Sequence, residues 1–325
     1  MSLQNVQSAT LGKYLSSRNL LIAGVARDCE TTIEADIRRL LAAVDCFGHI
    51  SWLIVESDSI DSTLDILNKL SLTIPNFRFL SLGALNNKIP ERTTRIAYCR
   101  NQYLRELRTN PLYENVDYLA VADLDGVNSQ ITSTAVQSCW LKKGWDVCCA
   151  NRAGPYYDIW AVRHKEWSPN DCWSQYNFLL KYRPSHEAAF ASAWSRMITI
   201  PEDNDWIEVD SAFGGFAIYR RSALADTASY IGGTSESYLG GPCEHVAFHF
   251  DIRRNGGSIF INPKLINGAE THHSKEARKL IEASRPEGAT IRARRLILKG
   301  VKAIIGAGTY NTIGSYVKRE ARPHS

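Results

Sequence analysis

The sequence lacks long apolar runs. Its 325 residues contain no stretch of about 18 consecutive apolar residues, so we expect no helix that crosses a membrane. Residues 1–19, MSLQNVQSATLGKYLSSRN, also lack the apolar centre of a signal peptide. Both absences predict a cytoplasmic protein.

CxxC motifs and a strong net charge are missing as well. The eight cysteines form no CxxC pair, which argues against a zinc ribbon, and they are too few for a disulfide scaffold in a chain of this length. Cys99, Cys148 and Cys149 lie in apolar runs, which predicts reduced, buried thiols. A net charge of +4 is too small to indicate nucleic-acid binding.

Glycine-rich phosphate loops are absent too. No GxGxxG follows an apolar run, which argues against a dehydrogenase. The first apolar run, in LLIAGVARDCE, is followed by no glycine-rich loop, which disfavours a nucleotidyltransferase. With 44% apolar and 22% charged residues, the composition is that of a globular domain.

Short apolar runs alternate with amphipathic stretches in the first half of the chain. Ile33, Ile37, Leu40, Leu41 and Val44 lie on one face of a helix. Strands separated by helices predict an α/β fold with a central, mainly parallel sheet flanked by helices. The expected strands are 20–26, 51–56, 77–82, 117–123 and 146–151, and the expected helices are 31–45, 62–70, 96–108 and 131–144.

Three later regions differ in composition. Residues 152–210 are rich in Trp, Tyr and Pro with weak periodicity, which fits either a loop wall around a polar ligand or an aromatic mini-core. A strand at 212–220, a helix after Cys243 and a strand near 258–265 are expected next. We expect a domain at 1–275, followed by a C-terminal helical extension at 276–325.

The extension contains IRARRLILKGVKAIIGAG at 291–308, which places Arg and Lys beside Leu, Ile and Val. This composition is typical of a basic amphipathic helix on an anionic membrane. It also fits a helix that packs its apolar face on the main domain. Peripheral attachment to the cytoplasmic membrane face is therefore one of two interpretations.

The segment YLAVADLDG contains the clearest chemical signal. An apolar strand ends in Asp123-Leu124-Asp125, whose two carboxylates point the same way. Carboxylates at the carboxyl end of a parallel strand suit a hard divalent cation, Mn²⁺ or Mg²⁺, that bridges a diphosphate. Ordinary turn residues are the alternative.

This arrangement resembles the GT-A glycosyltransferases, which use nucleotide sugars. IVESDSIDSTLDIL (54–67) looks like their second-strand segment, so the resemblance implies that Glu56 and Asp58 bind the nucleoside. RIAYCRNQYL (95–104) resembles the helix before the metal motif, which implies that Arg100 and Asp123 contact the donor.

The resemblance continues downstream. SAFGGFAIYR (211–220) looks like the glycine-bearing loop and strand of this fold, and Gly214 and Gly215 would let the backbone approach a substrate. Glu244 takes the place of an acidic residue that acts as general base in inverting members, although many members have Asp where this chain has His245. In THH (271–273), His272 or His273 is the implied third metal ligand.

Short motifs look like the capsule-associated, cryptococcal-type α-mannosyltransferases. They are the second-strand segment, the Arg-Asn helix, YYDIWAVR with Asp158, Trp160 and Arg163 as implied acceptor-binding residues, and Glu244 followed by His249. DLD departs from the Asn-Asp pair of those relatives and leaves the donor sugar open. Those relatives retain anomeric configuration, which would make Glu244 a positioning group.

The sequence therefore predicts a metal-dependent glycosyltransferase with a GT-A-type fold. Its donor would be GDP-mannose or a UDP-sugar and its acceptor a glycan or lipid-linked glycan in surface polysaccharide synthesis, with no nucleic-acid partner. The alternative from another class is a carbohydrate- or membrane-binding protein that keeps this fold without turnover. The acidic set Asp123, Asp125 and Glu244 argues against that alternative.

Overall fold

The structure is a computed structural model that describes residues 10–233, 242–269 and 275. These residues belong to Met1–Lys275, the first of two units into which the chain divides. The predicted C-terminal extension, 276–325, lies outside the described residues, as do His272 and His273.

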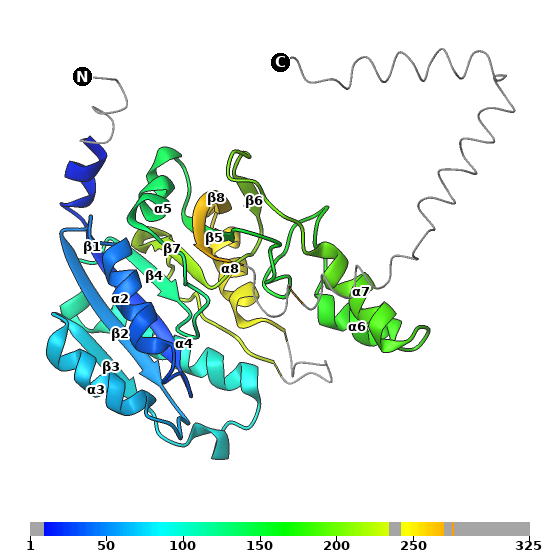
Figure 1. Cartoon of the computed structure of the whole chain (residues 1–325), viewed down its shortest axis with the longest axis horizontal. Coiled ribbons are helices and arrows are strands. Elements are labelled where there is room, and N and C mark those ends of the chain that lie inside the picture. Colours follow the sequence, from blue (N-terminus) through cyan, green and yellow to red (C-terminus); the bar gives the residue numbers. More distant parts are fainter. Residues whose placement is uncertain (1–9, 234–241, 270–274, 276–325) are drawn as a thin grey trace, which may run out of the picture. The chain divides into compact units, whose positions relative to one another are not determined.

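One eight-stranded sheet forms the centre of the described part of the chain (Figure 1). Its strand order is β3-β2-β1-β4-β7-β5-β8-β6, and four of the seven strand pairs are parallel. The strands are β1 (Asn19–Ala26), β2 (His49–Glu56), β3 (Phe77–Ser81), β4 (Tyr118–Ala122), β5 (Val147–Arg152), β6 (Ile207–Val209), β7 (Phe216–Arg220) and β8 (Ile259–Gly268).

Helices cover both faces of the sheet. Leu119 and Val121 of β4 share one apolar core with α4 and α8, whereas Ala120 and Ala122 share the other with α2, α3 and α5. This alternation is expected of a strand that is buried on both sides. The helices are α2 (Ile33–Ala43), α3 (Thr63–Thr73), α4 (Arg92–Thr109), α5 (Ser133–Gln137), α6 (Cys172–Leu179), α7 (Ser185–Ser192) and α8 (Glu244–Arg254).

The α/β class with a mainly parallel sheet, predicted from the alternating pattern, is confirmed. All five expected strands are present as β1 to β5, and three of the four expected helices as α2, α3 and α4. The helix expected over 131–144 is wrong in length, because α5 ends at Gln137 and a 3₁₀ turn follows. There the Ser138 hydroxyl donates to Ala135 O over 2.6 Å and competes with the helical ladder.

The aromatic region 152–210 is not a continuous loop. It contains α6, α7 and β6, and Asp171 caps α6 by accepting from the backbone N–H groups of Trp173 and Ser174. Tyr176, with Ala188 and Ala189, forms a small core between α6 and α7, with Trp173 and Trp194 packed against it. The mini-core interpretation is therefore confirmed for this part of the region.

Strand β7 runs in the opposite direction to its two neighbours in the sheet. It lies between β4 and β5 and is antiparallel to both. Ala122, the last residue of β4, pairs with Phe216, the first residue of β7. The loop before β7 therefore lies beside the loop after β4, and this places Gly214 and Gly215 next to Asp123.

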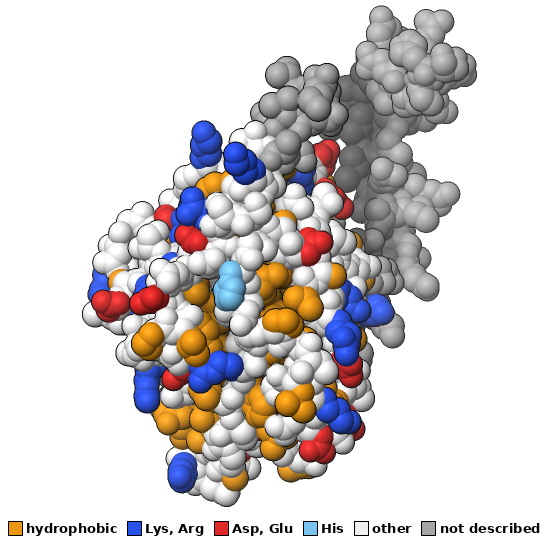
Figure 2. All heavy atoms as spheres, turned by 90° about the vertical axis from the view of Figure 1, so that its left-hand side faces the viewer, with side chains coloured by type: hydrophobic (Ala, Val, Ile, Leu, Met, Phe, Trp, Pro, Cys, Tyr) orange, Lys and Arg blue, Asp and Glu red, His pale blue; other side chains and the backbone are white. Residues whose placement is uncertain are grey.

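All eight cysteines are free, and all but Cys46 are buried, as expected. Among the described residues no helix is long and apolar enough to span a membrane. Figure 2 shows one side of the molecule, where hydrophobic side chains lie between scattered cations and anions. On that side no large patch carries charge of a single sign.

Candidate active site

One arginine brings together residues from α4, β4 and α8. Arg100 of α4 donates through Nε to Glu244 Oε1 over 3.0 Å and through a terminal nitrogen to Asp123 Oδ1 over 3.2 Å. Arg100 and Glu244 are buried, while the Asp123 side chain keeps 27% of its surface exposed. The sequence-predicted residues Arg100, Asp123 and Glu244 therefore form one cluster at the carboxyl end of β4.

Each carboxylate of this cluster uses one oxygen for Arg100. Among the described residues, no group donates to Asp123 Oδ2 or to Glu244 Oε2. The second terminal nitrogen of Arg100, Nη1, is buried and also has no hydrogen-bond partner there. The cluster thus keeps oxygen acceptors and a cationic donor for a ligand.

The site holds more negative than positive charge. Burial raises the pKa of Asp123 to about 7, with Arg100 opposing the shift and Asp125, Asp158 and Glu244 adding to it. Burial likewise raises the pKa of Asp158 to about 6, against the hydrogen bonds from the Gly214 and Ala161 N–H groups. A bound cation would lower both values, because it favours the ionised carboxylates.

Two glycines fix the loop beside Asp123. Gly214 donates to Asp158 Oδ2 over 2.9 Å, and Gly215 O accepts from the Asp123 N–H over 2.9 Å. Their φ angles are +72° and +89°, which favour glycine, and a Cβ on Gly215 would lie 2.7 Å from Val127 Cγ1. The glycines therefore position two carboxylates; contact with an acceptor stays a prediction for them.

Sequence reasoning missed the residues that support the aspartate loop. Asp36 of α2 is buried and accepts from the Gly126 N–H over 2.6 Å, and the Thr32 hydroxyl donates to Leu124 O over 2.9 Å. Asp125 lies between these two contacts and is exposed. A carboxylate at position 36, on the same helical face as Ile33 and Leu40, was the available signal.

Two asparagines complete the support. Asn128 donates to Asp123 O over 2.7 Å and to Gly215 O over 3.0 Å. Asn267 of β8 donates to Asn128 Oδ1 and to Gly214 O, both over 2.8 Å. Both asparagines are fully buried, and nothing in their local sequence distinguishes them from loop residues.

The predicted nucleoside-binding carboxylates have protein partners. Glu56 accepts from the Ser59 N–H over 3.0 Å and from the Ser81 hydroxyl over 2.6 Å. Asp58 accepts from the Asn86 N–H over 2.8 Å, and its other oxygen lies 3.2 Å from Arg95 Nε. Both carboxylates order the loop after β2, and a nucleoside contact stays a prediction for them.

The predicted acceptor residues lie in the loop after β5. Asp158 is joined to the site through Gly214, whereas Arg163 donates to the Trp160 and Val162 carbonyls and to Asp171 Oδ2 over 2.8 Å. The Trp160 indole N–H is buried without a hydrogen-bond partner in the described residues. Arg163 therefore fixes the start of α6, and an acceptor contact stays a prediction for Trp160 and Arg163.

Two histidines follow the cluster on α8. His245 stacks on Phe213 with ring centroids 3.9 Å apart, and burial lowers its pKa well below the usual value. His249 lies between the Ser211 and Tyr219 hydroxyls, at 2.9 and 2.8 Å, and burial lowers its pKa to about 3. Both rings are therefore neutral, and His249 is a core residue.

The residues of the site fit a hard divalent cation in part. Asp123 and Asp125 would supply carboxylate oxygens, the donors that Mn²⁺ and Mg²⁺ prefer, and the excess negative charge would favour a cation. Among the described residues no group of three His, Cys, Asp or Glu side chains could hold a metal. A third protein ligand would come from outside them, where His272 and His273 lie.

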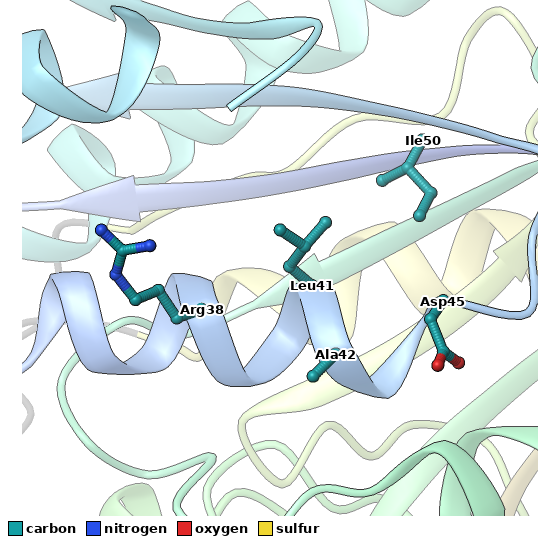
Figure 3. Close-up of a pocket in the computed structure, with 5 residues that line it drawn as sticks. All are labelled: Arg38, Leu41, Ala42, Asp45 and Ile50. Atoms are coloured by element: carbon teal, nitrogen blue, oxygen red, sulfur yellow. The ribbon is translucent and has the colours of Figure 1, made fainter. Parts of the chain in front are cut away.

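Two surface depressions lie away from this cluster. One, of about 440 Å³, lies between α2 and β2 and is lined by Arg38, Leu41, Ala42, Asp45 and Ile50 (Figure 3). Ile50 is near the start of β2, roughly 20 Å along the strand from Glu56. The other, of about 390 Å³, includes Arg18, Asp117 and Arg220 at the opposite ends of the strands from Asp123.

No protein-family model matches the sequence, and a comparison with curated proteins finds no match. Solved structures do match. Glucosyl-3-phosphoglycerate synthase from Mycobacterium tuberculosis with UDP is 14% identical with a TM-score of 0.40, over 84% of this chain and 81% of that one. The mannosyltransferase PcManGT from Pyrobaculum calidifontis, with GDP-Man and Mn²⁺, is 13% identical with a TM-score of 0.44, over 94% and 81%.

TarS from S. aureus with UDP-GlcNAc is 13% identical with a TM-score of 0.45, over 79% of this chain and 60% of that one. These neighbours are glycosyltransferases.

Proposed function

We propose that this chain is a metal-dependent glycosyltransferase that moves a sugar from a nucleotide-sugar donor to an acceptor hydroxyl. The observation that carries the proposal is the cluster in which Arg100 binds both Asp123 and Glu244, while each carboxylate keeps one oxygen that no described residue contacts. It lies where parallel strands end, which is the usual ligand position in such sheets.

Asp123 and Asp125, with His272 or His273, would hold the divalent cation. Such a cation would neutralise the charge that develops on the departing nucleoside diphosphate. Arg100 supports the same role, because its buried Nη1, which has no partner in the described part of the chain, is suited to an anionic group. Asp158, which lies near Asp123 and Glu244, adds to the negative charge that attracts the cation.

Glu244 has two possible roles, which depend on stereochemistry. In an inverting reaction its Oε2, the oxygen that Arg100 does not bind, would accept the proton of the acceptor hydroxyl as the general base. In a retaining reaction the same oxygen would orient that hydroxyl. Arg100 fixes the carboxylate in both cases through Oε1, so Arg100 is a positioning residue for Glu244.

The remaining assignments complete the proposal. Glu56 and Asp58 would contact the nucleoside through the loop that they order, and Asp158, Trp160, Arg163, Gly214 and Gly215 would shape the acceptor site. The motif resemblance described above supports GDP-mannose as one donor to test and surface polysaccharide synthesis as a setting. A lipid-linked acceptor at the cytoplasmic membrane face would suit the basic extension, 276–325.

The test measures binding and slow hydrolysis across UDP-, GDP- and CMP-sugars, with and without Mn²⁺. We expect one nucleotide class to bind and to turn over only with the metal. If a demonstrably folded sample neither binds nor hydrolyses any of these sugar nucleotides, the proposal is overturned and the non-catalytic binding protein is favoured.

A further inference from the structure

The turn between α6 and α7 carries exposed apolar side chains. We name residues 178–186 the hairpin tip. Phe178, Leu180 and Tyr182 are 58%, 42% and 72% exposed, and residues 180–187 are all exposed. Large side chains gathered at one exposed turn indicate an interaction surface.

The charge of the hairpin tip has one sign. From Cys172 to His186 the sequence contains no Asp or Glu, while Lys181 and Arg183 lie among the apolar residues. Glu187, the first acid after the tip, lies 3.8 Å from Arg183 and both side chains are about half exposed. An anionic surface would complement these cations.

The hairpin tip is ordered by its own backbone. Tyr182 and Arg183 donate their N–H groups to Leu179 O, both over 2.9 Å, and the Leu180 N–H donates to Tyr176 O over 2.9 Å. Leu179 packs on the small core between α6 and α7. Figure 1 shows α6 and α7 beside one another and apart from the sheet.

We propose that the hairpin tip inserts into the surface of an anionic lipid bilayer. Phe178, Leu180 and Tyr182 enter the boundary between headgroups and acyl chains, and Lys181 and Arg183 contact lipid phosphates. Aromatic side chains next to Lys and Arg are typical of membrane interfaces. An aliphatic Leu180 and the excess of cations favour lipid over a neutral glycan.

This surface differs from the predicted membrane contact of the extension, and its test does not depend on sugar transfer. Hydrogen exchange of the full chain is measured with vesicles of phosphatidylcholine and phosphatidylglycerol in equal parts, and with pure phosphatidylcholine. We expect protection of the peptide that covers the hairpin tip with the anionic vesicles. This readout is specific to the hairpin tip, because the peptide that is measured does not include the extension.

Two pairs of variants sharpen the test. Phe178→Ser with Tyr182→Ser should remove this protection and weaken vesicle partitioning by at least about tenfold. The matched control, Leu72→Ser with Leu112→Ser, removes apolar residues that are 87% and 67% exposed elsewhere and should change neither readout.

Lys181→Ser with Arg183→Ser should weaken partitioning by about fivefold for each cation removed, and added salt should reduce the difference. The control for this pair is Lys69→Ser with Lys143→Ser, both exposed.

Unchanged exchange at the hairpin tip with anionic vesicles would overturn the proposal, even if the chain binds through its extension. Protection of the same peptide by a neutral oligosaccharide alone would assign the surface to a glycan instead. A change of oligomeric state in the Phe178 and Tyr182 variant, without vesicle protection in the unmodified chain, would assign it to a second copy.

Discussion

Arg100 Nε donates to Glu244 Oε1 over 3.0 Å, in a buried ion pair that connects α4 to the first residue of α8. Arg100→Gln should lower the free energy of unfolding by about 3–5 kcal/mol, because it leaves two carboxylates without their cation. Denaturant unfolding measures the effect, and Arg105→Gln on the same helix is the exposed control. An unchanged midpoint would show that the pair does not stabilise the fold.

Glu244→Gln should separate chemistry from donor binding. The amide keeps the shape of the side chain but cannot accept a proton as a carboxylate does, so we expect turnover to fall by about 100-fold or more if Glu244 is the base. Donor affinity should change little. Steady-state kinetics and calorimetric titration of the nucleotide test this, and a wild-type rate would remove Glu244 from the mechanism.

Asp125→Asn should weaken Mn²⁺-dependent binding of a nucleoside diphosphate by at least about tenfold, because one anionic metal ligand is lost. Asp125 is exposed, so the thermal unfolding temperature should stay unchanged. Asp65→Asn, at an exposed position of α3, is the control. Equal affinity in the Asp125 variant and the wild type would contradict the metal assignment.

Gly215→Ala should lower the free energy of unfolding by more than the strain of its positive φ angle alone explains. The new Cβ would lie 2.7 Å from Val127 Cγ1, in a residue with φ of +89°. Gly256→Ala is matched for φ, at +84°, but has open space around it, and should cost only about 1 kcal/mol. The difference between the two in denaturant unfolding measures the close approach, and equal costs would show that Val127 moves freely aside.

Because His249 is buried, we expect the folded chain to lose stability in acid. Burial lowers its pKa to about 3, so between about pH 6.5 and 3 the folded chain binds fewer protons than the unfolded chain. Unfolding free energy therefore falls as pH drops through this window, by up to about 1.4 kcal/mol per pH unit. Asp123 and Asp158, with raised pKa values, act in the opposite direction.

His249→Gln isolates this contribution, because the aspartates are the same in both proteins. The variant should show a shallower pH dependence in denaturant unfolding than the wild type, whereas His186→Gln, at an exposed position, should not. Parallel curves for His249→Gln and wild type would show that His249 does not titrate in this way.

The parallel part of the sheet could be predicted because each of its strands is a continuous apolar run. The helices between these strands show a periodic pattern of apolar residues. Leu20 to Ala26 and Tyr118 to Ala122 are such runs. The direction of β7 could not be predicted, since pairing depends on long-range contacts that no local pattern records. Helices α6 and α7 were missed because eight residues give too few turns for a periodic signal.

The residues of the site likewise divide into those with a local sequence signal and those that only the folded sheet reveals. Asp123 follows an apolar strand and Glu244 begins a helix, so each had a local signal. Asn267 supports Gly214 from β8, far away in the sequence, and only the folded sheet brings the two together. The ion pair of Arg100 with Glu244 likewise joins residues 144 positions apart.

The reversed strand β7 also sets an order of events during synthesis. β1, β2 and β4 can pair as soon as residue 122 has left the ribosome, but the carbonyl that Asp123 N–H requires belongs to Gly215. Until then β4 presents an open edge to other chains, which is a risk for aggregation. Pairing of β7 closes that edge and supplies this carbonyl, and the nascent chain adds Glu244 of α8 and Asn267 of β8 to the site only after it.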